Sequence, residues 1–500
     1  MKRLVCLAVA ILTVLSMLAA CQKTEAPPTD DDTTPSTEAE TSPYLDALPD
    51  DLDFNEREVN IFYSVYDPNF DCKGLELEGS SFSEGDFISQ AVYERNEEVQ
   101  ERLNVILGFT QVDSNSDAAT YASAIENNII HTQSTEYDLI YHRAANAVVH
   151  ANEGYFKAVN DLPYVDWDKS YWFYDQMKSV SLNSSQIYVM LGDLLVSNYS
   201  NISTMFFNMD LYETLFPGKS AEELYTVVKN NEWTWDYYFS LVASCYVDND
   251  DQDGATPGDI YGANWENGAR TAQYYPYTCG LSFTSRDESG FPVLTLNNSR
   301  TVDMVIDLYD FINNNQGTYM MTFDQAQEKF LNGTMMFYGY FLSIGKIISQ
   351  TAEFDYGVLP FPKYDELTDY TSAILTGAGV FVIPYTITDE ARLSCIGATL
   401  EALCSTNARD VVPEYYETVL KVKQAGTPQN MEMIGFIRDH LKFDISFWMS
   451  NSLGKVASTF QQCIIKDNSN NYNATWDKLG TSYETALQNL INKYNNPENK

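Results

Sequence analysis

The most chemically distinctive stretch of the sequence is the acidic run VDNDDQDGATPGDIYG at residues 247–262. Carboxylate, side-chain amide and backbone carbonyl oxygens at alternating positions are the ligands that Ca²⁺ takes in EF-hand loops. In that pattern Asn249, Asp251 and Asp253 hold the first three ligand positions, and the backbone carbonyl of Ala255 is the next ligand. The spacing therefore makes this run a candidate calcium site.

The last ligand of the EF-hand pattern is missing from this run. Ile260 stands where the bidentate glutamate belongs, and Asp259 comes one place early. A helix is predicted before the loop and none after it, so the loop cannot open a groove as paired EF-hand sensors do. Two interpretations stay open: a structural calcium held by Asp259 and the four residues above, or a solvated acidic turn without metal. We expect no required cofactor.

The sequence carries no motif typical of catalysis. Its 4 histidines form no HExxH pair, its cysteines form no CxxC pair, and neither GxSxG nor GxxxxGK[ST] occurs. A glycoside hydrolase would need two carboxylates facing each other across a cleft, and no spacing among the 70 acidic residues selects such a pair. We therefore expect a protein that is not an enzyme.

The charge of the chain limits its partners. It has 30 basic and 70 acidic side chains, and its formal net charge is −40. Such a charge repels the phosphates of nucleic acids and anionic lipid headgroups, so we expect no nucleic acid partner. At 500 residues the chain is also longer than a single hydrophobic core usually allows, about 250–300 residues, and two domains are expected.

The first residues have the pattern of a lipoprotein signal peptide. Lys2 and Arg3 precede an apolar run that is shorter than the roughly 20 residues of a membrane span, and small residues then lead into Cys21. Residues 1–20 are therefore predicted to be removed. Similarity to bacterial lipoproteins implies that Cys21 then carries a diacylglycerol. An ordinary secretory signal, in which Cys21 has no role, is the alternative.

Residues 21–56 are predicted to be a disordered acidic tether. They are rich in Pro, Thr, Ser, Asp and Glu, and such a composition buries too little apolar surface to fold. The globular part is therefore expected to begin near Arg57.

Strands and helices alternate at the start of the globular part. EVNIFYSVYD, VILGFTQV and YDLIY are predicted strands, and DFISQAVYERNEEVQERLN and SDAATYASAIENNII between them are predicted helices. This βαβαβ order indicates a mainly parallel sheet covered by helices. Ligands bind at the carboxyl ends of the strands of such sheets, which places Tyr63, Tyr66, Tyr141, His142 and Arg143 at the functional edge.

A second run of α/β elements follows residue 186. IYVML, TMMFYG, FDYGVLPFPK and GVFVIP are predicted strands. Helices are predicted for EWTWDYYFSLVASCY, with Thr234 as its cap, and for TVDMVIDLYDFINNN, FDQAQEKFLNG and TDEARLSCIGATLEALCS.

The succession of these segments resembles the extracellular solute-binding proteins of carbohydrate ABC importers, of the maltose-binding-protein kind. The resemblance rests on the lipoprotein signal and tether and on YERNEEVQERLNV, YDLIY, the pair IYVMLGD and FFNMDLYE, NEWTWDYY, FLNGTMMFYGY, and FDYGVLPFPKYDE followed by GAGVFVIPYTITDEARLSCIGATLEALCS. It covers most of residues 57–500.

This family implies a periplasmic-binding-protein-like α/β fold of type II, with two lobes, hinge crossings between them and a central cleft. By resemblance, the crossings fall near residues 188–193, 334–340 and 372–380. Lobe one would contain residues 57–188 and 338–376, and lobe two would contain residues 189–337 and 377–500.

The resemblance also implies a ligand and partners. The ligand would be a sugar or oligosaccharide delivered to ABC permease subunits, and the protein would be a monomer at the extracellular face of the cell membrane, held there by its lipid alone. Aromatic rings stack on sugar C–H faces, and short polar groups bind the hydroxyls. The candidate ligand-binding residues are Tyr63, Tyr66, Tyr141, Arg143, Asp193, Trp265, Tyr338, Tyr340 and Trp448. A secreted glycan-binding lipoprotein or glycoside hydrolase not coupled to transport is the alternative.

Overall fold

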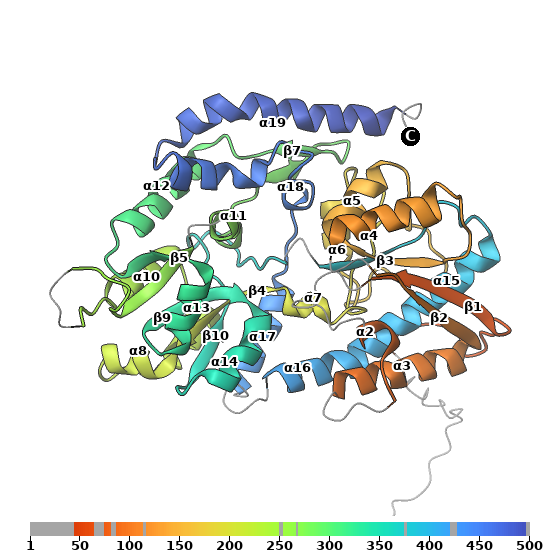
Figure 1. Cartoon of the computed structure of the whole chain (residues 1–500), viewed down its shortest axis with the longest axis horizontal. Helices are drawn as coiled ribbons and strands as arrows, with labels where there is room; N and C mark the ends of the chain where they lie inside the picture. Colours follow the sequence, from red (N-terminus) through yellow and green to blue (C-terminus); the bar gives the residue numbers. More distant parts are fainter. Residues whose placement is uncertain are drawn as a thin grey trace, which may run out of the picture. The chain divides into compact units, whose positions relative to one another are not determined.

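The computed structural model describes residues 45–64, 75–81, 87–113, 117–249, 254–266, 269–374, 378–420 and 428–496. They belong to one compact unit, Tyr44–Lys500. The described residues form two large β-sheets and one short two-stranded sheet, and we call the elements packed on each large sheet a lobe (Figure 1). The predicted signal peptide and Cys21 lie outside the described residues.

The sheet of lobe one has the strand order β11-β3-β1-β2. Its strands are β1 (Arg57–Tyr63), β2 (Val105–Gln111), β3 (Leu139–Arg143) and β11 (Gly379–Val382). β1 pairs in parallel with both β2 and β3, and β11 is antiparallel to β3. The βαβαβ prediction is therefore confirmed.

The sheet of lobe two has the strand order β10-β4-β9-β5-β8. Its strands are β4 (Ser203–Asn208), β5 (Tyr261–Glu266), β8 (Thr318–Met321), β9 (Met335–Phe341) and β10 (Tyr356–Leu359). β5 is parallel to both β8 and β9, so the carboxyl ends of these three strands meet at one edge.

Helices cover both sheets. Around the first sheet lie α2 (Leu75–Glu78), α3 (Phe87–Leu103), α4 (Ala118–Ile125) continued by η1 (Glu126–Ile130), α5 (Ala144–Asn152), α6 (Tyr174–Val180), and α15 (Glu390–Thr406) with η3 (Asn407–Val411). Around the second lie α8 (Met209–Leu215), α9 (Glu223–Lys229), α10 (Trp235–Ala243), α11 (Ala269–Thr278), α12 (Ser299–Asn313), α13 (Phe323–Leu331), η2 (Leu342–Ile344), α14 (Gly345–Thr351) and α17 (Pro428–Asp439). Thr234 caps α10 as predicted, because its hydroxyl accepts a hydrogen bond from the backbone N–H of Tyr237.

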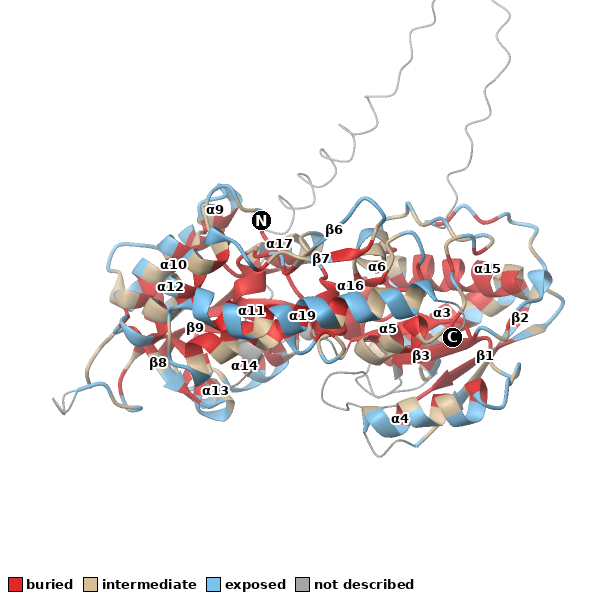
Figure 2. Cartoon of the chain, turned by 90° about the horizontal axis from the view of Figure 1, so that it is seen from above, coloured by how far each residue is buried: buried red, intermediate tan, exposed pale blue. Residues whose placement is uncertain are grey.

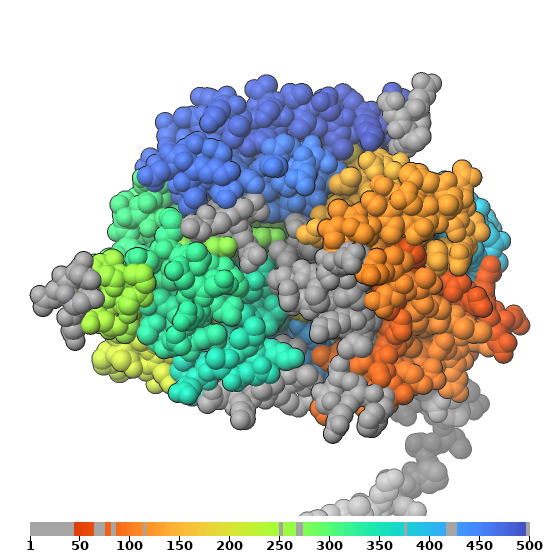
Figure 3. Space-filling model, viewed as in Figure 1, coloured from red at the N-terminus to blue at the C-terminus, as the bar shows by residue number. Residues whose placement is uncertain are grey.

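The remaining elements join or bridge the lobes. They are α7 (Ser197–Ser200), the hairpin β6 (Thr284–Arg286) and β7 (Pro292–Leu294), α16 (Val412–Leu420), α18 (Ile445–Trp448), η4 (Val456–Ser458), η5 (Gln461–Lys466) and α19 (Tyr472–Asn495). α18 contacts α5 and α6 of lobe one, whereas α19 packs on α12 of lobe two. Space-filling atoms of this C-terminal segment, in blue, lie against both the green part of lobe two and the orange part of lobe one (Figure 3).

The chain crosses between the lobes at places that differ in part from the prediction. Met190 bridges Phe381 of β11 in lobe one, and Ile202, next to β4 of lobe two, bridges Ile374, so the chain passes between the lobes after Met190 and after Ile374, close to two of the predicted crossings; residues 375–377 lie outside the described residues. A third connection runs through Leu441, which is bridged to Ser372.

The crossing predicted near residues 334–340 is instead the central strand β9, and the lobe boundaries change accordingly. β9 and β10 belong to the second sheet rather than to lobe one. β11 and α15 belong to lobe one, although the range 377–500 was assigned to lobe two. A buried strand and an interlobe crossing are both short apolar runs, so their sequence patterns are alike.

The ordered fold also begins before the predicted end of the tether at residue 56. Leu48 is buried in the core, and the buried Asp46 carboxylate accepts hydrogen bonds of 2.8 and 2.9 Å from the guanidinium of Arg102 on α3. The polar composition of this stretch concealed these two contacts.

The buried residues are concentrated in the interiors of the two lobes. Buried residues, in red, fill the sheets, and α19 shows a mostly exposed outer surface (Figure 2). The buried residues of α19 recur every three or four positions, which is the pattern of a helix that packs by one stripe. Cys245, Cys279, Cys395, Cys404 and Cys463 are free and buried. Within the described ranges, every helix is too short or too polar to traverse a bilayer.

Candidate functional site

Aromatic side chains gather at the carboxyl-end edge of the second sheet. Here β5 and β9 end next to α11 and α13, and they enclose a small cavity that we call the aromatic cavity. Its walls are Ser203, Asn264, Glu266, Tyr274, Tyr275, Phe323, Tyr338, Gly339, Tyr340, Phe341 and Phe361. Its volume is about 40 Å³, which holds a few waters, so a sugar ring enters only if these side chains move.

Strand alternation decides which residues of β5 reach this cavity. Asn264 and Glu266 line it, whereas Trp265 between them points into the core. The indole of Trp265 is fully buried and lies 5.1 Å from the ring of Tyr275 and 6.5 Å from that of Phe311, between centroids. The prediction that Trp265 faces the ligand is therefore corrected.

The two tyrosines predicted to flank the second crossing lie on β9 and line the aromatic cavity. The rings of Tyr338 and Tyr340 are stacked with centroids 5.9 Å apart, and Phe323 lies 4.7 Å from Tyr340. Gly339 lets other rings approach the strand, because a Cβ there would lie 2.9 Å from Phe361 and 3.0 Å from the hydroxyl of Tyr275. The cavity is thus built from closely packed rings with Glu266 as its carboxylate.

A larger cavity lies between the lobes, and we call it the interlobe cavity. α5 of lobe one forms one wall, and α18 with the segment that follows it, as far as η5, forms the other. Its volume is about 730 Å³, within the range of small-molecule sites. Two predicted residues line it from opposite sides, Arg143 and Trp448.

One aromatic contact joins the two cavities. Tyr274, which lines the aromatic cavity, stacks on Phe447, which lines the interlobe cavity, with centroids 5.6 Å apart and planes 18° from parallel. Tyr274 also packs edge-on against Phe341 at 5.9 Å. The two cavities therefore adjoin and form one candidate binding region.

Behind Arg143 lies a buried pair of histidines with defined proton positions. Nδ1 of His142 accepts a hydrogen bond of 2.9 Å from the backbone N–H of Arg143, so the proton of neutral His142 is on Nε2. That nitrogen lies 3.1 Å from Nδ1 of His150, which must accept, and the His150 proton is therefore on Nε2. Burial lowers the pKa of both rings and keeps them neutral.

This proton arrangement decides whether the nearby carboxylates can hold a metal. Ligand atoms of Glu126, His150 and Glu153 lie within 4.8 Å of one another. However, Nε2 of His150 carries a proton and faces Glu126 at 3.5 Å, so it offers no lone pair to a metal. With this proton arrangement the cluster is a neutral histidine beside two carboxylates rather than three free metal ligands.

Asp193 is engaged within the protein. Its carboxylate accepts hydrogen bonds of 2.7 and 2.9 Å from the guanidinium of Arg438 on α17, and the hydroxyl of Tyr199 also donates to it. Asp193 is 2% exposed and lines neither cavity, and burial raises its pKa. The prediction that it binds a sugar hydroxyl is therefore corrected: Asp193 fastens the first crossing to α17.

The predicted tyrosines of the first sheet lie in the core. Tyr63 is 3% exposed, and its hydroxyl donates to Glu78. Tyr141 is 4% exposed and packs against Phe381 of β11. Neither lines one of the two cavities, and Tyr66 lies outside the described residues.

The acidic loop is organised around Asp259. Its carboxylate is fully buried and accepts hydrogen bonds from the backbone N–H groups of Thr256 and Asn249, at 2.9 and 3.2 Å, and from the hydroxyl of Tyr246 at 3.2 Å. The hydrogen bond from Thr256 is the main cause of its lowered pKa. The ammonium of Lys329 donates to the carbonyl of Pro257 at 2.9 Å and supplies positive charge beside this carboxylate.

The described part of the loop thus meets the needs of Asp259 with protein donors. Asp251 and Asp253 lie outside the described residues, and Asn249 and Ala255 lie within them. A calcium site formed by these residues stays a prediction.

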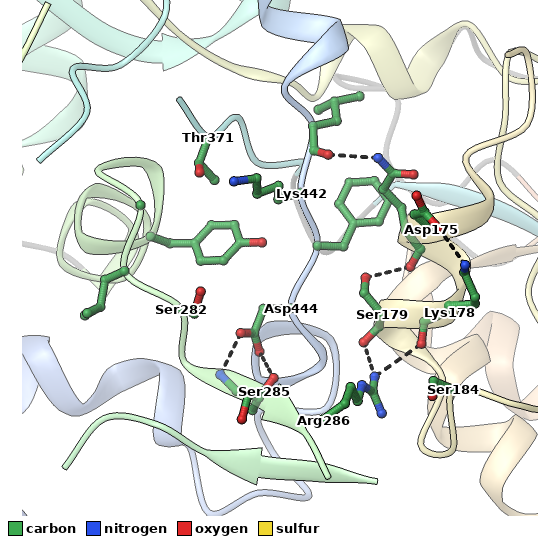
Figure 4. Close-up of a pocket in the computed structure, with 17 residues that line it drawn as sticks. Asp175, Lys178, Ser179, Ser184, Ser282, Ser285, Arg286, Thr371, Lys442 and Asp444 are labelled. Atoms are coloured by element: carbon green, nitrogen blue, oxygen red, sulfur yellow. Dashed lines mark hydrogen bonds and ion pairs between the residues drawn. The ribbon is translucent and has the colours of Figure 1, made fainter. Parts of the chain in front are cut away.

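A separate cavity of about 390 Å³ lies at another junction of the lobes (Figure 4). Thr371 and Lys442 lie on one side of it, and Lys178 and Ser179 of α6 lie on the other. Arg286 of the β6–β7 hairpin donates to the carbonyls of Lys178, Ser179 and Leu182 and so ties the hairpin to the end of α6. This cavity shares no lining residue with the candidate binding region.

Sequence reasoning missed several residues of the region. Glu266, Tyr274 and Phe447 carry its polar and aromatic contacts, and Phe323 and Phe361 complete the aromatic cavity. Tyr274 lies in the run AQYYPYT, whose aromatic clustering was an available signal. Pro276 inside α11 hid the helix that positions Tyr274.

Solved structures share the fold of this chain. A cyclic α-maltosyl-1,6-maltose binding protein from Arthrobacter globiformis matches at 12% identity with a TM-score of 0.59, covering 87% of this chain and 100% of its own. An ABC transporter solute-binding protein from Thermotoga lettingae, bound to α-D-tagatose, matches at 12% identity and a TM-score of 0.51, covering 87% and 100%. UgpB from Mycobacterium tuberculosis, in complex with glycerophosphocholine, matches at 13% identity and a TM-score of 0.51, covering 80% and 95%.

These similarities identify the fold. The chain has the two-lobed α/β fold of ABC substrate-binding proteins. The sequence matches no protein-family model and no curated protein.

Proposed function

We propose that this protein is a membrane-anchored extracellular solute-binding protein that captures a sugar or oligosaccharide between its lobes and delivers it to an ABC importer. The observation that carries this proposal is the joined pair of cavities at the edge of the second sheet. Rings of Tyr340 and Phe323 offer apolar faces for a sugar, and Asn264 and Glu266 beside them offer groups that bind hydroxyls.

The interlobe cavity supplies the space for most of the ligand. Its walls come from α5 of lobe one and from α18 to η5, of which η4 and η5 pack on α11 of lobe two, so a ligand there touches elements of both lobes. A ligand that contacts both lobes favours the arrangement in which both sets of contacts are made. The chain passes between the lobes at several places, among them residues 190–202 and the segment at Leu441, and such connections allow this change while the sheets stay intact.

The similar structures support a small polar ligand. One of those named binds a cyclic maltosyl-maltose, one is bound to tagatose, and the third is in complex with glycerophosphocholine. We favour a saccharide because aromatic rings and a carboxylate share one wall, which suits the alternating apolar faces and hydroxyls of sugars.

Binding without turnover fits the carboxylates of this region. Among the described residues that line the two cavities, Glu266 is the one carboxylate. A glycosidase uses two, about 5 to 9.5 Å apart. Lipid attachment at Cys21, a monomeric state and the permease partner are parts of the proposal that rest on the sequence pattern and the family resemblance.

Thermal-shift and calorimetric titrations of the purified protein test this function. Maltotetraose and other oligosaccharides are the probes, with glycerophosphocholine and short peptides as controls. We expect stabilisation by at least one saccharide, no release of product, and a loss of affinity of about tenfold or more in Tyr340→Ala, which removes a ring from the aromatic cavity.

The matched control is Tyr385→Ala, because Tyr385 is 38% exposed and lines none of the three cavities. This variant is expected to bind as the unchanged protein does. Stabilisation by peptides or glycerophosphocholine alone would contradict the sugar assignment, and hydrolysis that depends on Glu266 would favour the glycosidase alternative.

A further inference from the structure

The charged side chains that line the interlobe cavity are basic, in contrast to the chain as a whole, and the nearby Glu126 lies behind His150 of the lining. The chain has a formal net charge of −40, yet three basic residues line this cavity: Arg143, Lys455 and Lys466. No carboxylate is among its described lining residues. Because basic residues are outnumbered in this chain, three of them around one cavity indicate that their positive charge has a role there.

Arg143 differs from the other arginines in its lack of a partner. Arg102, for example, binds the buried Asp46 carboxylate with two nitrogens, and Nη2 of Arg438 donates to both oxygens of the buried Asp193 carboxylate. Across the ranges with described side chains, Arg143 is the arginine whose guanidinium makes no hydrogen bond or ion pair. Since acceptors are plentiful in this chain, an unpaired guanidinium at a cavity wall is available to a ligand.

The backbone at Arg143 adds to the positive potential. Arg143 is the N-cap of α5, a helix of nine residues, and no side chain caps its end. Ala145 and Asn146 of the first turn line the cavity. The N–H of Ala144 donates to the carbonyl of Ala378, and the N–H groups of the first turn that follow it carry partial positive charge and favour anions.

The excess of negative charge elsewhere does not cancel this local field. At physiological ionic strength exposed charges are screened beyond about 8 Å, whereas groups at contact distance within a cavity interact more strongly. Attraction by Arg143 therefore acts on a ligand that has entered the cavity, while the remaining surface repels anions that find no such contact.

We propose that the saccharide bound in the interlobe cavity is acidic and carries a carboxylate, phosphate or sulfate group. The inference rests on the proposed function and names the ligand class of the same region. Arg143 binds two oxygens of the anion, the N-terminus of α5 faces it, and Lys455 and Lys466 line the same cavity. Asn451 and Gln461 bind hydroxyls, and Trp448 lines the same wall.

Calorimetric titrations with matched pairs of probes test this inference. Each pair has the same number of sugar units and differs in an anionic group: a tetragalacturonate against a neutral galactotetraose, glucose 6-phosphate against glucose, and galactose 6-sulfate against galactose. We expect the acidic member of at least one pair to bind ten or more times as tightly as the neutral member, with the difference shrinking as salt is raised. The pair that shows the difference identifies which anion is recognised.

Arg143→Gln tests the assignment, because it keeps much of the side-chain length and removes the charge. It is expected to lower affinity for the acidic probe tenfold or more and to change affinity for its neutral partner less than twofold. Arg143→Lys, which keeps the charge and loses the two-nitrogen contact, is expected to fall between them. Tyr340→Ala serves as the control, since it weakens acidic and neutral probes alike.

Two outcomes overturn the inference, and they differ in what else they imply. Equal or tighter binding of the neutral members contradicts the charge preference and leaves the proposed function standing. Absence of binding by every probe contradicts the inference and the proposed function together.

Discussion

Tyr274 of α11 stacks on Phe447 of α18, with ring centroids 5.6 Å apart and ring planes 18° from parallel. The two rings belong to different walls: Tyr274 lines the aromatic cavity, and Phe447 lines the interlobe cavity. Phe447 also packs against Tyr277 at 4.9 Å, one helical turn further along α11. This contact holds the two parts of the candidate binding region in one fixed relation.

Removal of the Tyr274 ring is therefore expected to affect both stability and binding. Tyr274→Ala should lower the free energy of unfolding by about 3 kcal/mol, since it empties a buried aromatic position. It should also weaken saccharide binding about tenfold or more. Tyr274→Phe keeps the ring, and we expect both quantities to change little. Chemical denaturation and calorimetry measure the two effects, and normal binding by Tyr274→Ala would show that the stack does not shape the site.

Loss of the ion pair between Asp193 and Arg438 is expected to lower stability and to leave ligand binding unchanged. Asp193→Ala leaves a half-buried guanidinium without its carboxylate, and breaking such a pair costs about 3–5 kcal/mol. Because Asp193 lines neither cavity, ligand affinity below the unfolding temperature should change less than twofold. A variant with normal stability and lost sugar binding would restore the role first predicted for this carboxylate.

Much of the fold was predictable from sequence because its signals are local. Apolar periodicity located α3, α12 and α15, and the alternation of strands and helices identified the parallel sheet of lobe one. Membership of β9 in the second sheet was not predictable, since MMFYGYF reads equally well as a crossing. What distinguishes them is the set of neighbouring strands, which is a long-range property.

The candidate site was predictable only in part. Arg143, Tyr340 and Trp448 follow from their positions at strand ends or in late loops, and they line the cavities. The prediction for Trp265 was wrong because successive residues of a strand point to opposite faces of the sheet. Trp265 points into the core, and Glu266, the next residue of β5, lines the cavity. The stack of Tyr274 on Phe447 joins segments far apart in sequence, and no local pattern encodes it.

The histidine pair behind Arg143 predicts a dependence of stability on pH. Burial lowers the pKa of His142 and His150 below the unfolded value near 6.5, so the unfolded chain binds more protons as pH falls below that value. Stability from this pair is thus fully present above about pH 6.5 and is lost as pH falls toward the folded pKa values. Within that window each histidine contributes a slope of up to about 1.4 kcal/mol per pH unit.

Urea unfolding at pH 7.5 and pH 5.5 measures this slope. Carboxylates also titrate, so the informative quantity is the difference between the unchanged protein and His150→Gln. We expect a smaller loss of stability on acidification in the variant. His440→Gln is the control, because His440 is only partly buried and has no contact with the pair. Equal slopes in all three proteins would contradict a role for the pair.

The acidic loop offers the last prediction, which separates its two interpretations. Asp259→Ala removes a buried carboxylate that accepts hydrogen bonds from Thr256, Asn249 and Tyr246, so it should lower the free energy of unfolding by about 2–3 kcal/mol. The loss should persist in excess chelator, because protein donors satisfy this carboxylate. Asp251→Ala and Asp253→Ala are the matched variants, and a calcium site would make their effect appear only when calcium is present. If chelator erased the difference between Asp259→Ala and the unchanged protein, the carboxylate would act through a bound metal rather than through the loop's own hydrogen bonds.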